Sequence, residues 1–369
     1  GFVLKPRLSW QRSIRQSGAP GTNLGDIRDG GGLARFDYPL DLKTDIYTGR
    51  LEVAHPPIGR LSGTIGAEVQ HQDADTRGPA ELQPSARTWN TGVFFFEDLD
   101  LDPITVSFGS RLDVRTVEAV PNQRTRDADR LDNTYTTLSG AVGASYAFGD
   151  GVAIATNLSS GFRAPSVFEL YASGVHGGVA AFQQGNPDLE PERSYSADLS
   201  LRVRRDRVTA EVTGYVNAIQ NYIYLENTDR ERGVSNGDTL SVFVANQTEA
   251  LIPGIEATVE TSPLPWLKVG GSAAVLDGTG DGLGADEGDD GELPLLPANT
   301  VSGFVRWVPA DTGPLTNSQV ELSLKRALDK DAAGRFEPFA QFDKLDTEGP
   351  NPSFGTASTR AYSVVNVEA

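Results

Sequence analysis

The stretch "GFRAPSVFELY" spans residues 161–171 and follows a run of alternating small and apolar residues. Pro165 has no backbone N–H and biases Ala164 toward extended geometry, so a β-ladder cannot continue through this point. A long Gly-rich segment, "ASGVHGGVAAFQQGNPDLEPE" (172–192), follows directly and contains two further prolines. The stretch therefore predicts a strand that stops abruptly, a surface loop framed by prolines, and a second strand after the loop.

Apolar side chains occupy alternate positions in many other segments of the chain. Residues 103–115 and 194–204 each carry one apolar and one polar face when written as a strand, because successive side chains of a strand point to opposite sides. The same register recurs at 61–70, 208–217 and 319–325. Helical periodicity is weak throughout, so the pattern predicts an all-β protein.

Composition excludes several classes of function. The 369 residues include 50 acids and 32 bases, a net charge of -18, which argues against a nucleic-acid partner because phosphate binding needs a basic surface. The absence of cysteine removes disulfides, thiolate metal sites and cysteine nucleophiles together. Mean hydropathy is -0.31, and no apolar run reaches the roughly 18 residues of a transmembrane helix.

Short and long connections alternate between the predicted strands. The short ones include "GDG" at 149–151 and "RD" at 205–206. The long ones are expected at about 15–44, 73–86, 119–133, 163–192, 226–239, 278–298 and 328–360. Tight turns at one end and long loops at the other are typical of outer-membrane barrels, and we expect about fourteen strands of roughly 10–15 residues. A soluble antiparallel sandwich, which also alternates, is the alternative fold.

The motifs "NLSSGFRAPSVFELYASG" (157–174) and "GNPDLEPERSYSADLSL" (185–201) together resemble the barrel of TonB-dependent outer-membrane receptors. Later segments, "VTGYVNAIQNYIYL" (212–225), "LIPGIEATVE" (251–260) and "AYSVVNVEA" (361–369), fall in the order usual for that family. The resemblance implies an antiparallel up-and-down transmembrane β-barrel in the bacterial cell outer membrane. Residues 1–369 would then be part of a 22-stranded barrel domain, without the N-terminal plug domain and its energy-coupling box.

Two segments, 79–101 and 172–182, most resemble the branch of this family linked to zinc or haem uptake. That branch has a Gly-Pro-His element and a Phe-Glu-x-Gly return. This chain has Gly-Val-His and Phe-Gln-Gln-Gly instead, and its histidines are His55, His71 and His176. His55 lies in a predicted short turn, where a structural role is expected.

Ligand capture is expected in the long loop 163–192, with help from neighbouring loops. The candidate ligand contacts in this loop are Glu169, Tyr171, His176, Phe182 and Asp188. His176 lies among glycines, where a backbone can approach a ligand closely, and a neutral imidazole binds Zn²⁺. The alternative is that His176 is an ordinary polar residue of the loop.

Two acidic segments are further candidates for cation binding. His71, Asp73 and Asp75 occupy alternate positions and would share one strand face, a spacing compatible with zinc. In "DGTGDGLGADEGDDGE" (277–292), the carboxylates of Asp281, Asp286, Asp289 and Asp290 are candidate calcium ligands, although the EF-hand pattern is not met. An acid-rich rim and a solvated loop are the respective alternatives.

The resemblance therefore implies a receptor, and no enzymatic activity is expected. We expect extracellular loops to capture a metal ion, a metal–siderophore complex or haem, and a TonB-type energy-coupling complex, acting through a plug, to open the barrel. Expected partners also include outer-membrane lipid and lipopolysaccharide. No cofactor is expected beyond a loop-bound divalent cation. A passive porin-like channel and a soluble all-β adhesin are the alternative functions.

Overall fold

Almost every described element of the chain is a β-strand. The computed structural model describes residues 1–17, 40–78, 82–120, 131–176, 181–233, 239–283, 290–293, 296–310, 318–330 and 360–368. The long strands are β1 (Val3–Ser17), β2 (Leu40–Ala54), β3 (Leu61–Arg77), β4 (Ala86–Asp100), β5 (Ile104–Ala119), β6 (Asp132–Gly149), β7 (Val152–Arg163), β10 (Glu192–Arg205), β11 (Val208–Gly233), β12 (Thr239–Leu264), β13 (Leu267–Leu276), β16 (Thr300–Trp307), β17 (Val320–Ala327) and β18 (Tyr362–Glu368). The short elements are α1 (Val167–Tyr171), β8 (Ser173–His176), β9 (Ala181–Gln184), β14 (Thr279–Gly280) and β15 (Gly291–Glu292).

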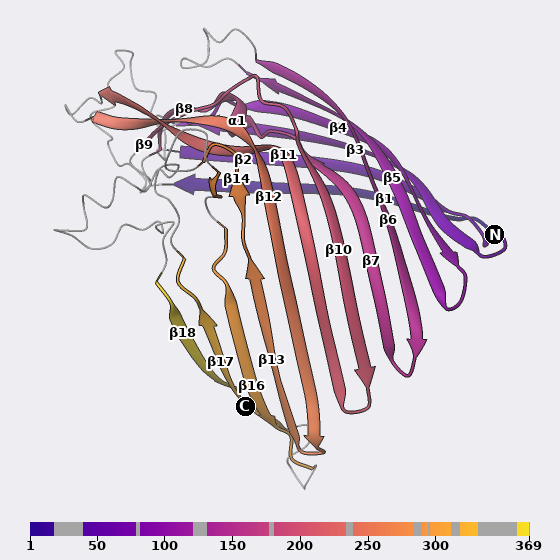
Figure 1. The fold of residues 1–369 in the computed structure, drawn as a ribbon. Helices are drawn as coiled ribbons and strands as arrows, with labels where there is room; N and C mark the ends of the chain where they lie inside the picture. The colour runs from indigo at the N-terminus through magenta and orange to yellow at the C-terminus, as the bar shows by residue number, and fades with distance from the viewer. Residues whose placement is uncertain are drawn as a thin grey trace.

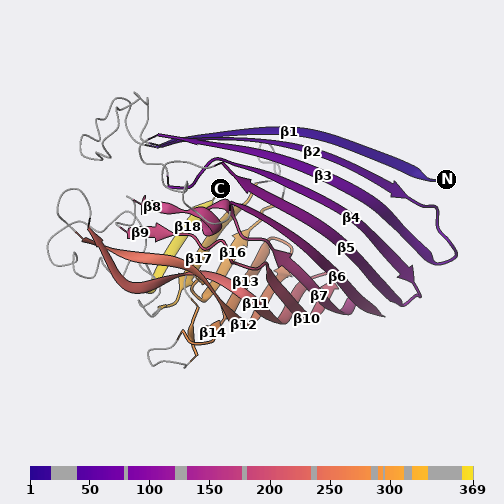
Figure 2. The same cartoon turned by 90° about the horizontal axis from the view of Figure 1, so that it is seen from above.

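The long strands form one antiparallel meander that curves into a trough (Figure 1). Each pairs with the next long strand along the chain; β7 pairs with β10 and β13 with β16 across the long connections that contain the short elements. Strands β1 and β18 lie at the two edges of the described sheet. Figure 2 shows the curvature from above. The predicted up-and-down barrel wall is confirmed, with fourteen long strands among the described residues.

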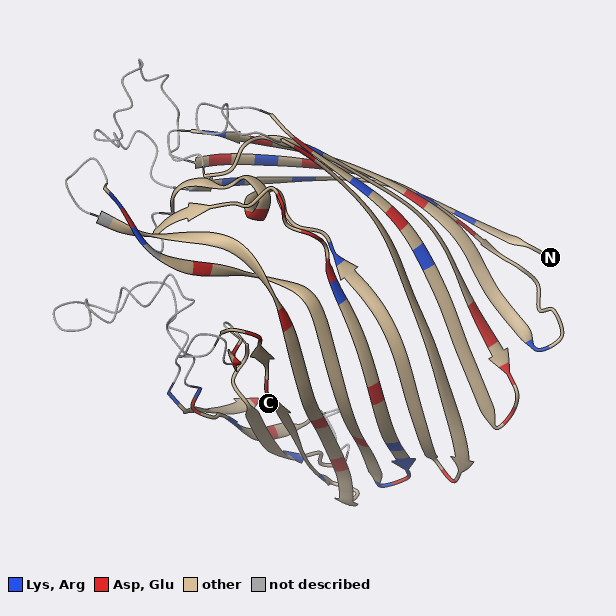
Figure 3. Ribbon diagram, turned by 45° about the horizontal axis from the view of Figure 1, so that its top comes forward, with Lys and Arg blue, Asp and Glu red and all other residues tan. Residues whose placement is uncertain are grey.

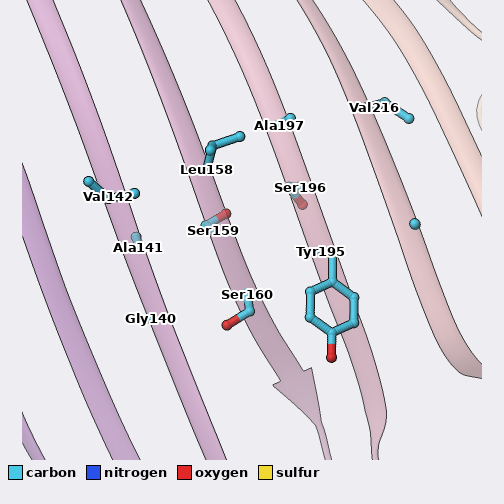
Figure 4. Close-up of a pocket in the computed structure, with 11 residues that line it drawn as sticks. Gly140, Ala141, Val142, Leu158, Ser159, Ser160, Tyr195, Ser196, Ala197 and Val216 are labelled. Carbon is cyan, nitrogen blue, oxygen red and sulfur yellow. The ribbon is translucent and has the colours of Figure 1, made fainter.

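The convex face of the trough is apolar and uncovered. One row across four strands, Val142, Leu158, Ala197 and Val216, is continuous in register. Figure 4 shows part of this face around a shallow hollow of about 590 Å³. Leu158 remains 56% exposed, although full burial of such a side chain stabilises by about 1.5–3 kcal/mol. In the described part of the chain no second sheet covers this face, as a soluble sandwich would require, and a bilayer is the solvent that suits it.

Aromatic side chains border the apolar face at both ends of the strands. On the long-loop side of the apolar face, Trp10, Tyr47, His71 and Trp89 face one another in register across β1–β4. Near the short-turn ends the exposed aromatics are Tyr146, Phe148, Trp266 and Trp307. Such belts lie at the two membrane–water interfaces of barrels.

Strands β11 and β12 continue well past the ends of their neighbours (Figure 1). Each has 26 residues, so strand structure occupies most of the loop predicted at 226–239. Two register shifts, between Ile219 and Tyr222 and between Asn227 and Glu231, allow the hairpin to extend and bend. Asn221 takes the extra position of the first shift with a φ of 57°, which asparagine tolerates better than most residues. We call residues 222–233 and 239–248 the β11–β12 arm.

The remaining long connections are described only in part. The loops predicted at 15–44, 119–133, 278–298 and 328–360 lie partly or mainly outside the described residues. The loop predicted at 73–86 is shorter than expected because β3 continues to Arg77. Among the described residues no helix has the length and apolarity needed to cross a membrane.

Candidate functional site

The two proline-framed motifs meet at the long-loop end of β7 and β10. Arg163, the last residue of β7, lies opposite Glu192, the first residue of β10. Its guanidinium donates to both carboxylate oxygens of Glu192, from Nε and Nη2, at 2.6 Å each. A second acid, Glu169, accepts from Arg163 Nη1 at 2.9 Å. The arginine of the Arg-Ala-Pro element therefore joins the outgoing strand, the returning strand and the loop between them.

Helix α1 begins directly after the Pro165 break. Ser166 is its N-cap: the Ser166 hydroxyl accepts from the Glu169 backbone N–H, and the Glu169 carboxylate accepts from the Ser166 backbone N–H at 2.7 Å. This capping box satisfies two backbone donors that a helix terminus leaves open. The Glu169 carboxylate thus caps the helix and also binds Arg163. A ligand that bound Glu169, as predicted, would have to compete with these two interactions.

Helix α1 packs against the concave face of the trough. Val167, Leu170 and Tyr171 form a buried cluster with Val117 of β5 and Ile223 of β11. Val117 points to the concave side because it is an odd number of residues from Val114, which is exposed on the convex face. The cluster joins β5 to the arm, so loop 163–192 folds inward across the mouth of the trough.

Polar bonds fix the returning half of the same loop. Tyr171 Oη donates to Asn133 Oδ1, while Asn133 Nδ2 donates to the Pro187 carbonyl at 2.9 Å. Tyr135 Oη donates to the carbonyl of Leu189 at 3.1 Å. Both acceptors belong to the Asn-Pro-Asp-Leu-x-Pro-Glu element, which is thereby bound to β6.

The arm is attached to the same element by Gln247. Its side-chain amide donates to the carbonyls of Glu190 (2.8 Å) and Asn221 (2.9 Å), and its Oε1 accepts from the Glu190 backbone N–H at 2.9 Å. Glu192 Oε1 also accepts from the Ile223 backbone N–H at 2.8 Å. The bend at Asn221 is therefore held by Gln247 and by Glu192, and Glu192 also binds Arg163.

Further along the arm, β9 pairs in parallel with β12. Phe182 is buried, and the guanidinium of Arg232 lies 4.0 Å from its ring centroid, a cation–π contact. Phe243 of the arm is fully buried with Ala181. The short strands of loop 163–192 and the arm therefore make one folded layer.

A second long connection packs against the arm. Leu283 and Leu293 are fully buried in a cluster with Ala250, bordered by Tyr222 and Tyr224 of the arm. The Asp281 backbone N–H donates to the Glu249 carbonyl at 3.0 Å. Leu283, within the acidic segment 277–292, and Leu293, directly after it, thus anchor this segment to the arm.

The wall below these loops carries a network of charges on the concave face. Arg111 donates to Glu68 at 3.2 Å and to both oxygens of Asp113 at 2.8 Å, and Arg50 binds Glu68 at 3.2 Å. The guanidinium carbons of Arg50 and Arg111 lie 4.6 and 5.5 Å from the ring centroid of Phe94. Figure 3 shows acidic and basic positions along the strands of this half of the sheet.

The structure places the five predicted ligand contacts of loop 163–192 in different surroundings. Glu169, Tyr171 and Phe182 lie in one connected structure, where each has a structural partner. Asp188 is exposed, and its backbone N–H donates to Asn186. His176 is the last residue of β8, opposite Ala181 in the backbone pairing. No ligand contact of these five residues is tested by the geometry, so that role stays a prediction.

The predicted cation ligands are also placed differently from one another. The His71 and Trp89 rings are in contact, with centroids 4.2 Å apart and planes tilted by 30°. His71 Nε2 lies 3.2 Å from Asp73 Oδ2, while Asp75 binds Arg77. Asp281 and Asp290 are described, whereas Asp286 and Asp289 lie outside the described residues. Within the described ranges no group of three or more histidine, aspartate or glutamate side chains is arranged to hold a metal ion, and both cation sites stay predictions.

Several framing residues were not singled out from the sequence, namely Arg163, Ser166, Asn133 and Gln247. The Ser-x-x-Glu spacing of Ser166 and Glu169 is a recognisable capping box and was available as a signal. Asn133 and Gln247 act from strands far away in sequence, and no local pattern marks them.

Comparison with known proteins identifies the architecture. A family model described as TonB dependent receptor-like, beta-barrel, matches residues 4–369. The chain belongs to this family. It is accordingly a part of an outer-membrane β-barrel, and the apolar convex face is its bilayer-facing side.

Individual relatives of this receptor barrel are more distant. A vitamin B12 transporter, BtuB of Photobacterium profundum, is 28% identical over 171 residues, which is 46% of this chain and 25% of the relative. The copper transporter OprC matches 99% of the chain with a TM-score of 0.70 and 15% identity, and 53% of OprC is covered. The FrpB iron transporter of Neisseria meningitidis has a TM-score of 0.67, 12% identity, and 99% and 52% coverage. The chain thus spans about half the length of the solved structures, and those likenesses concern the fold.

Proposed function

We propose that this TonB-dependent receptor barrel captures a metal ion or metal chelate at its extracellular mouth and admits it to the periplasm through TonB-driven gating. The observation that carries the proposal is the inward packing of loop 163–192, where α1 lies on the concave face and is bound to β5, β6 and the arm. A mouth covered in this way suits a receptor that first binds its ligand and then opens. A passive porin needs an open path, so the geometry favours the receptor.

Binding would occur on the layer made by loop 163–192, the arm and the connection between β13 and β16. These three segments pack on one another through two hydrophobic clusters on either side of the arm. Movement of any one of these segments would therefore displace the other two. The charged network of Arg50, Glu68 and Arg111 would then present a wet, polar wall along the path. The relatives named above are described as transporters of vitamin B12, copper and iron, which supports metals and metal chelates as the first substrates to test.

The test uses the full-length gene in a cell-based uptake assay. Cells with and without the gene are supplied with ⁵⁵Fe-citrate, CuCl₂ or ⁵⁷Co-cyanocobalamin, and accumulation is measured in TonB-positive and TonB-deleted strains. We expect gene-dependent accumulation of at least one of the three probes in the TonB-positive strain alone. Accumulation that persists without TonB would establish the passive channel instead.

A further inference from the structure

Two buried polar atoms on neighbouring strands have no hydrogen-bond partner among the described residues. They are Arg115 Nε on β5 and Thr137 Oγ1 on β6. Thr137 is only 2% exposed. Almost all buried polar groups in folded proteins are hydrogen-bonded, so two unsatisfied atoms on adjacent strands require an explanation.

The two side chains share the concave face. Arg115 is opposite Tyr135 in the β5–β6 register and Thr137 is opposite Asp113, so Arg115 and Thr137 are diagonal neighbours. Diagonal pairs on one sheet face lie roughly 7–8 Å apart at their Cα atoms, within reach of a long side chain. Val117, two residues beyond Arg115 on the same face, is fully buried beneath α1. The pair therefore lies at the lower border of the region that α1 covers.

Arg115 differs from the other arginines described on this wall. Arg50, Arg111, Arg202 and Arg306 each have a carboxylate partner. The acid nearest to Arg115 along the same strand face is Asp113, and Arg111 already binds both of its oxygens at 2.8 Å. The residues opposite Arg115 on β4 and β6 are Asn90 and Tyr135, neither of which supplies a carboxylate.

A partly buried guanidinium without a counter-charge is costly, and a guanidinium can only donate hydrogen bonds. A threonine hydroxyl can donate as well, so one oxyanion would satisfy both atoms. We propose that Arg115 and Thr137 form an oxyanion-binding site beneath α1 that takes a carboxylate. The carboxylate comes from an anionic metal chelate, which rests on the proposed function, or from another segment of the full-length receptor.

The test is thermal unfolding of the full-length receptor in a non-ionic detergent, with and without sodium citrate as the probe. The variants are Arg115→Met, Arg115→Lys and Thr137→Val. Arg202→Met serves as the matched control, because Arg202 is on the same face of the wall and its charge is already paired with Glu211 at 3.0 Å. Ligand that binds the folded state alone raises the unfolding temperature.

For a carboxylate supplied by the chelate, citrate raises the unfolding temperature of the wild type, and Arg115→Met abolishes that rise while increasing stability without citrate. Arg115→Lys and Thr137→Val retain a response with the half-saturating citrate concentration raised by about tenfold, as expected for the loss of one charge-assisted bond. For a carboxylate supplied by the receptor itself, citrate has no effect on the wild type and Arg115→Met lowers the unfolding temperature. The Arg202→Met control follows the wild type in either case.

A wild type that ignores citrate together with an Arg115→Met variant of unchanged unfolding temperature would overturn the proposal, since solvent alone would then satisfy both atoms. Uptake in the cell assay separates this outcome from failure of the proposed function. If the wild type shows TonB-dependent uptake although it ignores citrate and its unfolding temperature is unchanged by Arg115→Met, the oxyanion site is wrong and the receptor function stands. Absence of uptake by the wild type would contradict the proposed receptor function.

Discussion

Arg163 and Glu192 close the base of the long loop 163–192 with a bidentate ion pair, both N–O distances being 2.6 Å. The pair joins the last residue of β7 to the first residue of β10, and Glu192 is 9% exposed. The same carboxylate accepts the backbone N–H of Ile223, so one side chain fixes two strands and the start of the arm. The two sequence motifs that frame the loop thus meet in a single contact.

Glu192→Gln is expected to destabilise the loop base by about 1–3 kcal/mol, because a charge-assisted bidentate bond is replaced by a weaker amide contact. The upper part of that range is reduced because the Arg163 side chain is 45% exposed to solvent. The measurement is the urea unfolding midpoint in detergent, together with limited trypsin digestion of loop 163–192. Glu211→Gln, which removes the partner of the exposed Arg202, should cost less than about 1 kcal/mol. Equal losses in the two variants would remove the special role of Glu192.

Tyr171→Phe tests whether the predicted ligand residue Tyr171 is a structural one. The substitution leaves the ring in its buried cluster and removes the bond from its hydroxyl to Asn133. We expect a loss of about 1–2 kcal/mol in the free energy of unfolding, because the Asn133 carbonyl group loses a buried partner. Ligand affinity should follow stability alone. A variant with unchanged stability and strongly reduced affinity would instead make Tyr171 a ligand contact.

Gly92 is required by the charge network on the wall. A Cβ at this position would overlap Arg111 Nη2 and Asp113 Oδ1. Gly92→Val should therefore displace Arg111 and destabilise the barrel by about 1–3 kcal/mol. Gly214→Val is the matched control, since nothing lies within 4 Å of a Cβ there. Chemical unfolding of both variants decides the prediction, which fails if Gly214→Val is the more damaging.

The wall of the barrel could be predicted from the sequence, because each strand has to place apolar side chains on the bilayer side at every second position. Segment 103–115 shows this directly: Leu112 and Val114 are exposed on the convex face, while Arg111 and Asp113 form the network on the other. The break at Pro165 was equally predictable, since proline removes a ladder donor.

The mouth could not be predicted in the same way. The arm depends on a bulge at Asn221, and one extra residue reverses which side chains face α1, so period-two reasoning loses the register there. The partners of the loop, Asn133 on β6 and Gln247 on β12, come from strands distant in sequence. An unpaired Arg115 is likewise visible only when its neighbours on β4 and β6 are known.

His55 makes two polar contacts at the short-turn end of the wall. It lies in the turn between β2 and β3, where its Nδ1 is 2.8 Å from the Pro56 carbonyl oxygen and its Nε2 is 2.9 Å from Glu97 Oε2. Both neighbours accept hydrogen bonds, so the ring satisfies them only when both nitrogens are protonated. The Pro56 carbonyl first, and Glu97 second, raise the pKa of His55 above its ordinary value.

A raised pKa means that the folded state binds this proton more tightly than the unfolded state. The stabilisation is complete below the unfolded pKa of about 6.5 and is lost as pH rises through the higher pKa of the folded state. We therefore expect the urea midpoint of the wild type in detergent to fall between about pH 6 and pH 8 by more than that of His55→Gln. Glu97→Gln should reduce the slope too, because it removes the charged acceptor. A His55→Gln variant with the wild-type slope would show that another group titrates, and that the turn is held without the imidazolium.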